Sequence, residues 1–314
     1  MARLSLLAAG VGLLFTALRT TPALSRPLCF VALLPTATFL RSGVTADTVT
    51  TALAFLLFAT LLSLRNGVGP IGEGDVVLLV LVGASLALAK TGYLPLTWAA
   101  LALPHERFRS RRARRWSLVL AIGVPVLASV LWMLTLEDWT TSTWHRRADP
   151  TEQLRLLVEQ PIRLLFVLGA TWLSPERLGH LARAFVGRIV VLSTPAFFAP
   201  IAVLVVAVLV VGDKRAPSPS LRERVIHAGA ALACVAEISL GLYLSWTAPG
   251  SPTVRGFQGR YLYPLAPFLL FALLPPRQLR CQLPPRLAAG LVVLVALAMN
   301  VYAIMMVGSW LSAR

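Results

Sequence analysis

Apolar runs separated by short polar segments recur along the whole chain, and they constrain its fold more than any other feature. The runs cover residues 4–18, 28–40, 49–64, 76–89, 93–103, 116–136, 162–173, 190–211, 225–246, 262–274 and 287–307. Of the 314 residues 57% are hydrophobic and 13% are charged, a composition outside the range of soluble globular domains. Backbone groups inside a bilayer must be satisfied internally, which favours helices. We therefore expect an all-α, polytopic membrane protein, a single transmembrane domain over 1–314 with about nine to ten transmembrane helices.

The basic residues gather in short loops between these runs and give a formal net charge of +16. The loops of interest lie near Arg107 to Arg115, Lys214 to Arg224 and Arg277 to Arg286. Such a distribution is typical of cytoplasmic loops under the positive-inside rule, so we expect a multi-pass protein of the cell membrane and no nucleic-acid partner. The loop around Arg260 would then lie on the outer side.

The longest polar stretch opens a region, residues 137–190, that we expect to be extracytoplasmic. Asp149, Pro150 and Glu152 form a strong helix start, with a capping acid, a proline in the first turn and a second carboxylate. Leucine and valine side chains then recur on one face, which predicts an amphipathic helix on the membrane surface. If the basic loops on either side are both inside, an even number of spans separates them, and residues 162–173 are interfacial or re-entrant.

The segment VRGFQGRYLYPLAP, residues 254–267, brings polar, cationic and aromatic groups to a membrane boundary. Gly256 and Gly259 allow tight turns and close approach of a ligand. Gln258 offers an amide, Arg260 a fork of donors suited to phosphate, and Tyr261 an interfacial ring. These residue types predict a site for an anionic head group.

Three further residues have a functional and a structural interpretation each. Asp47 lies just before an apolar run, where it is either a helix cap or part of a site. Lys90 ends a run, as a snorkelling lysine or a ligand contact. Glu237 lies within a run, where an ionisable side chain is either functional or neutral and hydrogen-bonded to a neighbouring helix. The four histidines show no ligand spacing, so we expect no metal site and no cofactor.

The 254–267 segment resembles the Gly-x-Gln-Gly-Arg-Tyr-x-x-Pro signature of the predicted membrane proteins called domain of unknown function 2142. Three other segments resemble the same family in the same order. They are LPTATFLRSGVTADT (34–48), KTGYLPL (90–96) and ADPTEQLRLLVEQP (148–161). Together the four matches span nearly the whole chain.

That family in turn resembles the GT-C glycosyltransferases, multi-span enzymes that transfer sugar from a polyprenyl-phosphate carrier at the outer face of the membrane. The resemblance implies a GT-C-like fold and a carrier site made by Lys90, Gln153, Gln258, Arg260 and Tyr261, with Asp47 as a tentative catalytic acid. It also implies a polyprenyl-phosphate sugar and the lipid membrane as partners. No feature of the sequence specifies an oligomeric state.

One departure from the resemblance concerns the catalytic acid. GT-C enzymes usually carry it in the first outer loop, and the opening of this chain instead resembles a later helix of the fold. We therefore expect that the N-terminal part of the domain, with its acidic loop, is absent from this chain. Glu137 and Asp138 are substitutes for that acid besides Asp47.

Three functions fit these features. The first is a glycosyltransferase-like protein that binds a lipid-linked sugar for transfer to a cell-envelope glycan or lipid. The second is a transporter or flippase of a lipid-linked saccharide, for which Glu237 would lie on the path. The third is a non-catalytic membrane subunit. An enzyme needs its charges clustered at the outer face, whereas a flippase needs them along the membrane depth.

Overall fold

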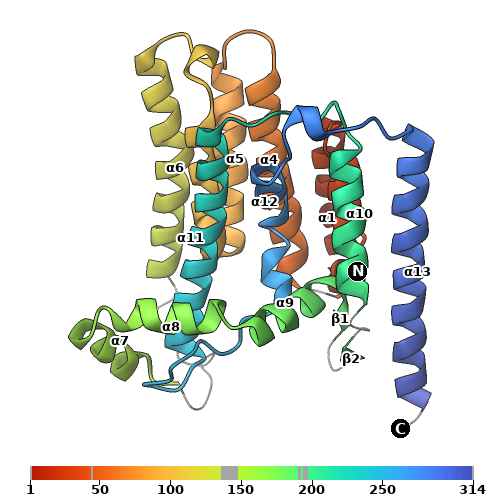
Figure 1. Ribbon diagram of the computed structural model, residues 1–314. Helices are drawn as coiled ribbons and strands as arrows, with labels where there is room; N and C mark the ends of the chain where they lie inside the picture. Colours follow the sequence, from red (N-terminus) through yellow and green to blue (C-terminus); the bar gives the residue numbers. More distant parts are fainter. Residues whose placement is uncertain (1, 44, 136–147, 190–191, 194–196, 313–314) are drawn as a thin grey trace.

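The computed structural model of the protein describes residues 2–43, 45–135, 148–189, 192–193 and 197–312. Almost all of this chain is helical, and the helices run back and forth as a bundle (Figure 1). Within these described ranges, five helices are long and apolar enough to cross a membrane. They are α1 (Ala2–Thr20), α4 (Ala46–Asn66), α6 (Arg111–Leu134), α11 (Leu221–Ser245) and α13 (Pro285–Ser312). The predicted class, an all-α polytopic membrane protein, is confirmed.

The other apolar runs of the bundle form shorter or broken helices. Pro35 opens a new helix and thereby divides residues 25–42 in two. Pro95 lies inside a tighter 3-10 helix. These shorter elements are α2 (Ser25–Ala32), α3 (Pro35–Ser42), α5 (Glu73–Ala89), η1 (Thr91–Ala102), α10 (Phe198–Val211) and α12 (Ala266–Ala272).

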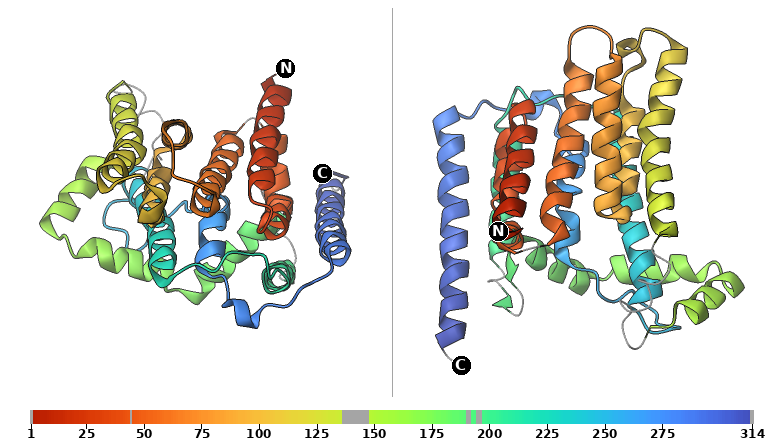
Figure 2. Two further views of the ribbon diagram at one scale, coloured as in Figure 1. Left: turned by 90° about the horizontal axis from the view of Figure 1, so that it is seen from above. Right: turned by 180° about the vertical axis from the view of Figure 1, so that it is seen from behind.

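Helix α4 forms the centre of the bundle. In its most apolar stretch 78% of the residues are buried, against 17% to 28% in the other four long helices. Phe55 and Phe58 of α4 are almost completely enclosed. By contrast, α6 and α13 stand at the edges of the bundle (Figure 2) and expose side chains such as Leu131 and Leu294. Apolar outer faces of this kind suit contact with lipid tails rather than water.

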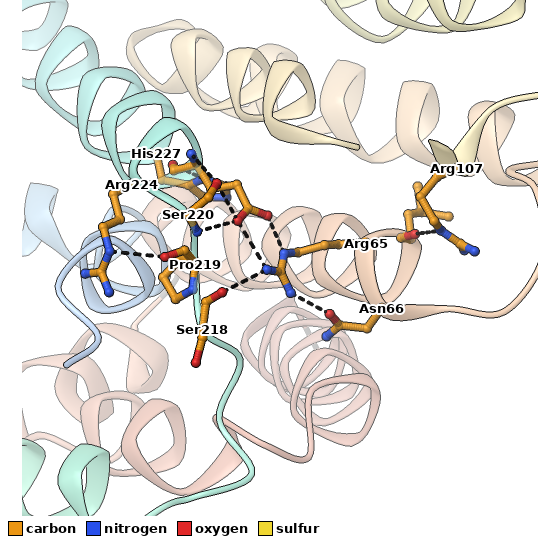
Figure 3. A network of polar contacts seen from close by, with 10 residues as sticks. Arg65, Asn66, Arg107, Ser218, Pro219, Ser220, Arg224 and His227 are labelled. Carbon is orange, nitrogen blue, oxygen red and sulfur yellow. Dashed lines mark hydrogen bonds and ion pairs between the residues drawn. The ribbon is translucent and has the colours of Figure 1, made fainter. Parts of the chain in front are cut away.

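The three basic loops meet at one end of the bundle, which we call the basic end. It includes η2 (His105–Arg107) and η5 (Arg277–Leu279). Arg65 at the end of α4 forms an ion pair with Glu223 at the start of α11, as Figure 3 shows. Arg280 donates to the carbonyl oxygen of Ala216 at 2.5 Å and so ties the second loop to the third. The three loops therefore share one side of the protein, as their predicted cytoplasmic location requires.

At the opposite end, three helices lie across the ends of the long ones (Figure 1). They are α7 (Pro150–Glu159), α8 (Arg163–Trp172) and α9 (Pro175–Gly187). Two antiparallel strands of two residues each, β1 (Arg188–Ile189) and β2 (Leu192–Ser193), follow α9. The predicted start of α7 is confirmed, because the Asp149 carboxylate accepts from the Glu152 backbone N–H at 3.0 Å. Residues 163–172 run across the bundle, the orientation that the count of crossings favours.

Candidate functional site

Four of the sequence-predicted site residues converge at the end of the bundle opposite the basic loops, which we call the site end. Asp47 lies in the first turn of α4, Lys90 directly follows α5, and Arg260 and Tyr261 lie in the short helix η4 (Gly259–Leu262). The Lys90 Nζ atom lies 3.0 Å from Asp47 Oδ1, and the Arg260 Nε atom lies 3.3 Å from Asp47 Oδ2. One carboxylate therefore joins two cations, and the cluster keeps a net positive charge.

Two tyrosine rings fix the position of this cluster. The Lys90 Nζ atom lies 4.3 Å from the ring centre of Tyr261, within the range of a cation–π contact. The Tyr93 hydroxyl donates to the Tyr261 carbonyl oxygen at 3.0 Å and links η1 to η4. Lys90 is thus held between a carboxylate and an aromatic ring instead of extending toward the membrane surface as a snorkelling lysine would.

Arg260 has donors that none of the described residues uses. Its Nε atom is close to Asp47 but without the geometry of a hydrogen bond, and its terminal nitrogens make no hydrogen bond with the described residues. The side chain is 34% exposed. It lines a cavity of about 550 Å³ together with Thr36, His180 and Gln258. A guanidinium with unused donors beside a polar cavity can accept an anion bidentately.

The two glycines of this segment permit a turn and close packing of the backbone. Gly256 has a φ of +84°, and a Cβ atom there would lie 2.5 Å from Cδ1 of Trp246. A Cβ atom at Gly259 would lie 2.4 Å from the backbone nitrogen of Phe185 in α9. The segment therefore packs closely on Trp246 and on the α9 backbone at these two positions, and both glycines also line the cavity. These glycines hold the segment in place so that Gln258 and Arg260 line the cavity.

Helix α9 is fastened to the same segment by its C-terminal half. The ring of Tyr263 stacks on Phe185 with centres 4.4 Å apart, and its hydroxyl donates to the Phe185 carbonyl oxygen. Thr36 of α3 donates to the Ala184 carbonyl oxygen at 3.2 Å. Helix α9 therefore forms one wall of the cavity, and it brings His180 to the wall.

Gln153 is placed apart from the cluster. Its side chain is buried in α7, where Nε2 donates to the Tyr243 carbonyl oxygen at 3.1 Å and Oε1 accepts from the Gly250 N–H at 3.0 Å. Both ends of the amide are thus committed to holding α7 against the end of α11. Gln153 does not line the cavity that Arg260 lines.

Glu237 lies on α11, away from this cavity and only partly buried. In the described part of the chain it makes no hydrogen bond or ion pair with another side chain, so the neutral, hydrogen-bonded interpretation finds no partner there. The other two acidic candidates, Glu137 and Asp138, lie outside the described residues.

Sequence reasoning missed His180 and Thr36 as cavity residues. Neither stands in a motif of polar residues. His180 reaches the cavity only because α9 packs against η4, a tertiary contact that no local spacing encodes. Thr36 does lie in one of the four family-like segments, which was the available signal.

Comparisons with known proteins identify the family of this chain. No curated protein and no solved structure matches the chain. The family described as "Predicted membrane protein (DUF2142)" matches residues 1–269, a range that includes Asp47, Lys90, Gln258, Arg260 and Tyr261. The chain therefore belongs to the DUF2142 family of predicted membrane proteins.

Proposed function

We propose that this protein binds a polyprenyl-phosphate-linked sugar at its site end, on the outer face of the membrane, and acts in transfer of the sugar to a cell-envelope glycan or lipid. The observation that carries the proposal is the unused guanidinium of Arg260 at the wall of a 550 Å³ cavity. Lys90 and Asp47 beside it come from different helices, so the cluster is a product of the fold.

In this proposal Arg260 binds the carrier phosphate with its terminal nitrogens, and the Gln258 amide donates to the same group. When the bond between sugar and phosphate breaks, negative charge develops on the phosphate. Fixed cations in a site with little water stabilise such charge and lower the barrier. Lys90 contributes to this field from its position between Asp47 and Tyr261.

Asp47 has two successive roles in the proposal. Before a ligand binds, it is the counter-ion that keeps Lys90 and Arg260 together. Once a phosphate pairs with the two cations, the Asp47 carboxylate is free to accept a proton from the acceptor hydroxyl. The tentative catalytic role of Asp47 therefore depends on prior binding of the carrier.

A flippase for a lipid-linked saccharide is the second candidate, favoured by Glu237. This carboxylate lies eight residues before the end of α11, about 12 Å along the helix from the site end. A transport path would use it together with charges spread along the membrane depth. The clustering of Asp47, Lys90 and Arg260 at one end favours the transferase.

The test measures sugar transfer and lipid translocation in proteoliposomes loaded with a polyprenyl-phosphate sugar. Arg260→Ala is expected to abolish transfer, because it removes the proposed phosphate ligand. Arg255→Ala is the matched control: it removes an equal charge from the same loop, but Arg255 is exposed and does not line the cavity. Full transfer by Arg260→Ala contradicts the carrier role.

The same assay separates the two candidates. Glu237→Gln is expected to leave transfer unchanged under the transferase proposal. Translocation that depends on Glu237 and is indifferent to Arg260 would establish the flippase instead.

A further inference from the structure

A cluster of five arginines at the start of α6 has no partner among the described residues. Its members are Arg109, Arg111, Arg112, Arg114 and Arg115, and none of their side chains makes a hydrogen bond or ion pair with the described part of the chain. All but one of them are exposed. The neighbouring basic residues differ: Arg107 donates to the Leu64 carbonyl oxygen, and Arg222 to that of Leu101. The cluster therefore has charge available for a partner outside the chain.

The cluster does not stabilise the helix that it begins. The N-terminus of a helix carries a partial positive charge, so acidic residues stabilise it and cations oppose it. Helices α5 and α11 start at the same end with Glu73, Asp75 and Glu223, whereas the first turn of α6 has no acidic residue. None of these three carboxylates pairs with the cluster in the part of the chain that the structure describes. A bound anion would offset the repulsion.

Two members of the cluster lie on the face of α6 that meets lipid. Helix α6 stands at the edge of the bundle (Figure 2), and its exposed apolar residues include Val119, Leu127 and Val130. At 3.6 residues per turn, these three residues and Arg115 all lie within about 60° of the direction of Arg112 around the helix axis. One face of α6 therefore begins with two arginines and continues as an apolar surface.

Trp116 indicates where the membrane interface crosses this face. It lies one turn after Arg112 and is 58% exposed. Tryptophan favours the head-group level of a bilayer, where its apolar ring and its polar N–H both find suitable surroundings. Arg112 and Arg115 then lie at the level of the lipid phosphates, and Val119 and later residues at the level of the acyl chains. One phospholipid can contact both parts of the face.

We propose that the start of α6 binds an anionic phospholipid from the leaflet at the basic end. Arg112 and Arg115 hold its phosphate, the other arginines of the cluster add to the attraction, and the apolar face of α6 covers an acyl chain. A zwitterionic phospholipid carries a cation beyond its phosphate, which the cluster repels, so the surface favours an anionic head group. The inference does not depend on the phosphate site at Arg260, which lies at the opposite end of the bundle.

The experiment measures lipid binding to the full chain in detergent micelles by native mass spectrometry. The probes are dioleoyl phosphatidylglycerol, dioleoyl phosphatidylcholine and, as a head group without acyl chains, glycerol phosphate. The test variant carries Arg112→Gln and Arg115→Gln. Glutamine is a good helix former and the other arginines of the cluster remain, so the helix and the positive-inside bias are kept. The control carries Lys214→Gln and Arg215→Gln, which removes an equal charge from an exposed loop of the same end.

We expect the wild type to bind phosphatidylglycerol more tightly than phosphatidylcholine, with no measurable binding of glycerol phosphate. The test variant should bind phosphatidylglycerol about thirtyfold more weakly, with hardly any change for phosphatidylcholine. The control should keep the wild-type affinities.

Three results would overturn the proposal. An unchanged affinity of the test variant for phosphatidylglycerol would place the lipid elsewhere. An equal loss in the control would mean that the general charge of the basic end attracts lipid without a site on α6. Glycerol phosphate bound as tightly as the lipid would mean a site for a free anion instead of a lipid surface.

Discussion

Arg224 and Arg280 at the basic end of the bundle and Arg260 at the site end use their donors in opposite ways. At the basic end, Arg224 donates to the carbonyl oxygens of Ala272 and Leu274 at 2.7 and 2.6 Å. Arg280, only 3% exposed, donates to those of Pro275, Ala216 and Pro217. Arg65 pairs with the Glu223 carboxylate and also donates to the Ser218 carbonyl oxygen at 3.2 Å (Figure 3). At the site end, the terminal nitrogens of Arg260 make no hydrogen bond with the described residues.

This difference separates structural cations from candidate binding cations. Carbonyl oxygens at helix ends and turns lack partners within their own segment, and an arginine that covers them stabilises the fold. Such an arginine has few donors left for a ligand. Arg260 is positioned equally well but retains its donors, and it faces a cavity. The comparison predicts that loss of Arg224 or Arg280 at the basic end changes stability, whereas loss of Arg260 at the site end changes binding.

The largest expected effect is an all-or-none difference in labelling between the ends. Cys281 is exposed at the basic end and serves as a native reference. A cysteine introduced as Ser251→Cys marks the loop of the site end. In intact cells an impermeant thiol reagent should label the introduced cysteine from outside and reach Cys281 only after permeabilisation. Labelling of the Ser251 position from the cytoplasmic side alone would reverse the orientation of the protein.

The next effect concerns stability. Arg280→Ala leaves three carbonyl oxygens, one buried and two partly buried, without their donor, and we expect a loss of about 3 kcal/mol in the free energy of unfolding. Arg260→Ala should cost less than about 1 kcal/mol, because its ion pair with Asp47 is partly exposed. Reversible unfolding in mixed detergent micelles measures both. Equal losses for the two variants would remove the distinction between the ends.

A smaller effect is expected when the counter-ion is removed. Asp47→Asn leaves two cations without their shared carboxylate, so affinity for undecaprenyl phosphate should rise about threefold. Sugar transfer should nevertheless fall, because the proposed proton acceptor is gone. Binding and transfer are measured on one preparation. A fall in affinity would mean that Asp47 orders the site more than it competes with the ligand.

The smallest effect is expected on α7. Hydrogen bonds from Arg155 lower the pKa of Glu152, so the folded helix favours the ionised carboxylate. The resulting stabilisation is present above the ordinary pKa of glutamate and is lost as the pH falls through the lowered value. Arg155→Gln should remove this pH dependence: it lowers stability slightly at neutral pH, since the pair is on the surface, and leaves stability at pH 3 unchanged. A thermal melt at pH 3 and pH 7 tests this.

Much of the site was predictable because its residues lie in segments with strong local signals. Asp47 and Lys90 stand at the ends of apolar runs, and topology alone brings such ends to the same side of a membrane. Arg260 and Tyr261 lie in a short polar loop between two runs. Their convergence on a single carboxylate follows from helix packing, and no periodicity in the sequence specifies it.

The roles of Gln153 and Gly259 could not be predicted, because they depend on tertiary contacts that local sequence patterns do not contain. Gln153 has the polarity of a binding residue, but its amide is used between α7 and α11. Gly259 lies so close to the α9 backbone that a Cβ atom would not fit there. The sequence of α9 is that of an ordinary amphipathic segment and gives no sign of this contact. Run lengths alone did not specify the short elements α3 and η1, where Pro35 and Pro95 divide or tighten apolar runs.

The central claim is that the site end holds a lipid phosphate through Arg260. Native mass spectrometry of the protein extracted from its membrane tests this claim most directly, with Arg255→Ala as the charge-matched control. We predict a lipid phosphate adduct on the wild type and on Arg255→Ala, and a loss of that adduct on Arg260→Ala. An adduct of equal abundance on all three proteins would contradict the claim.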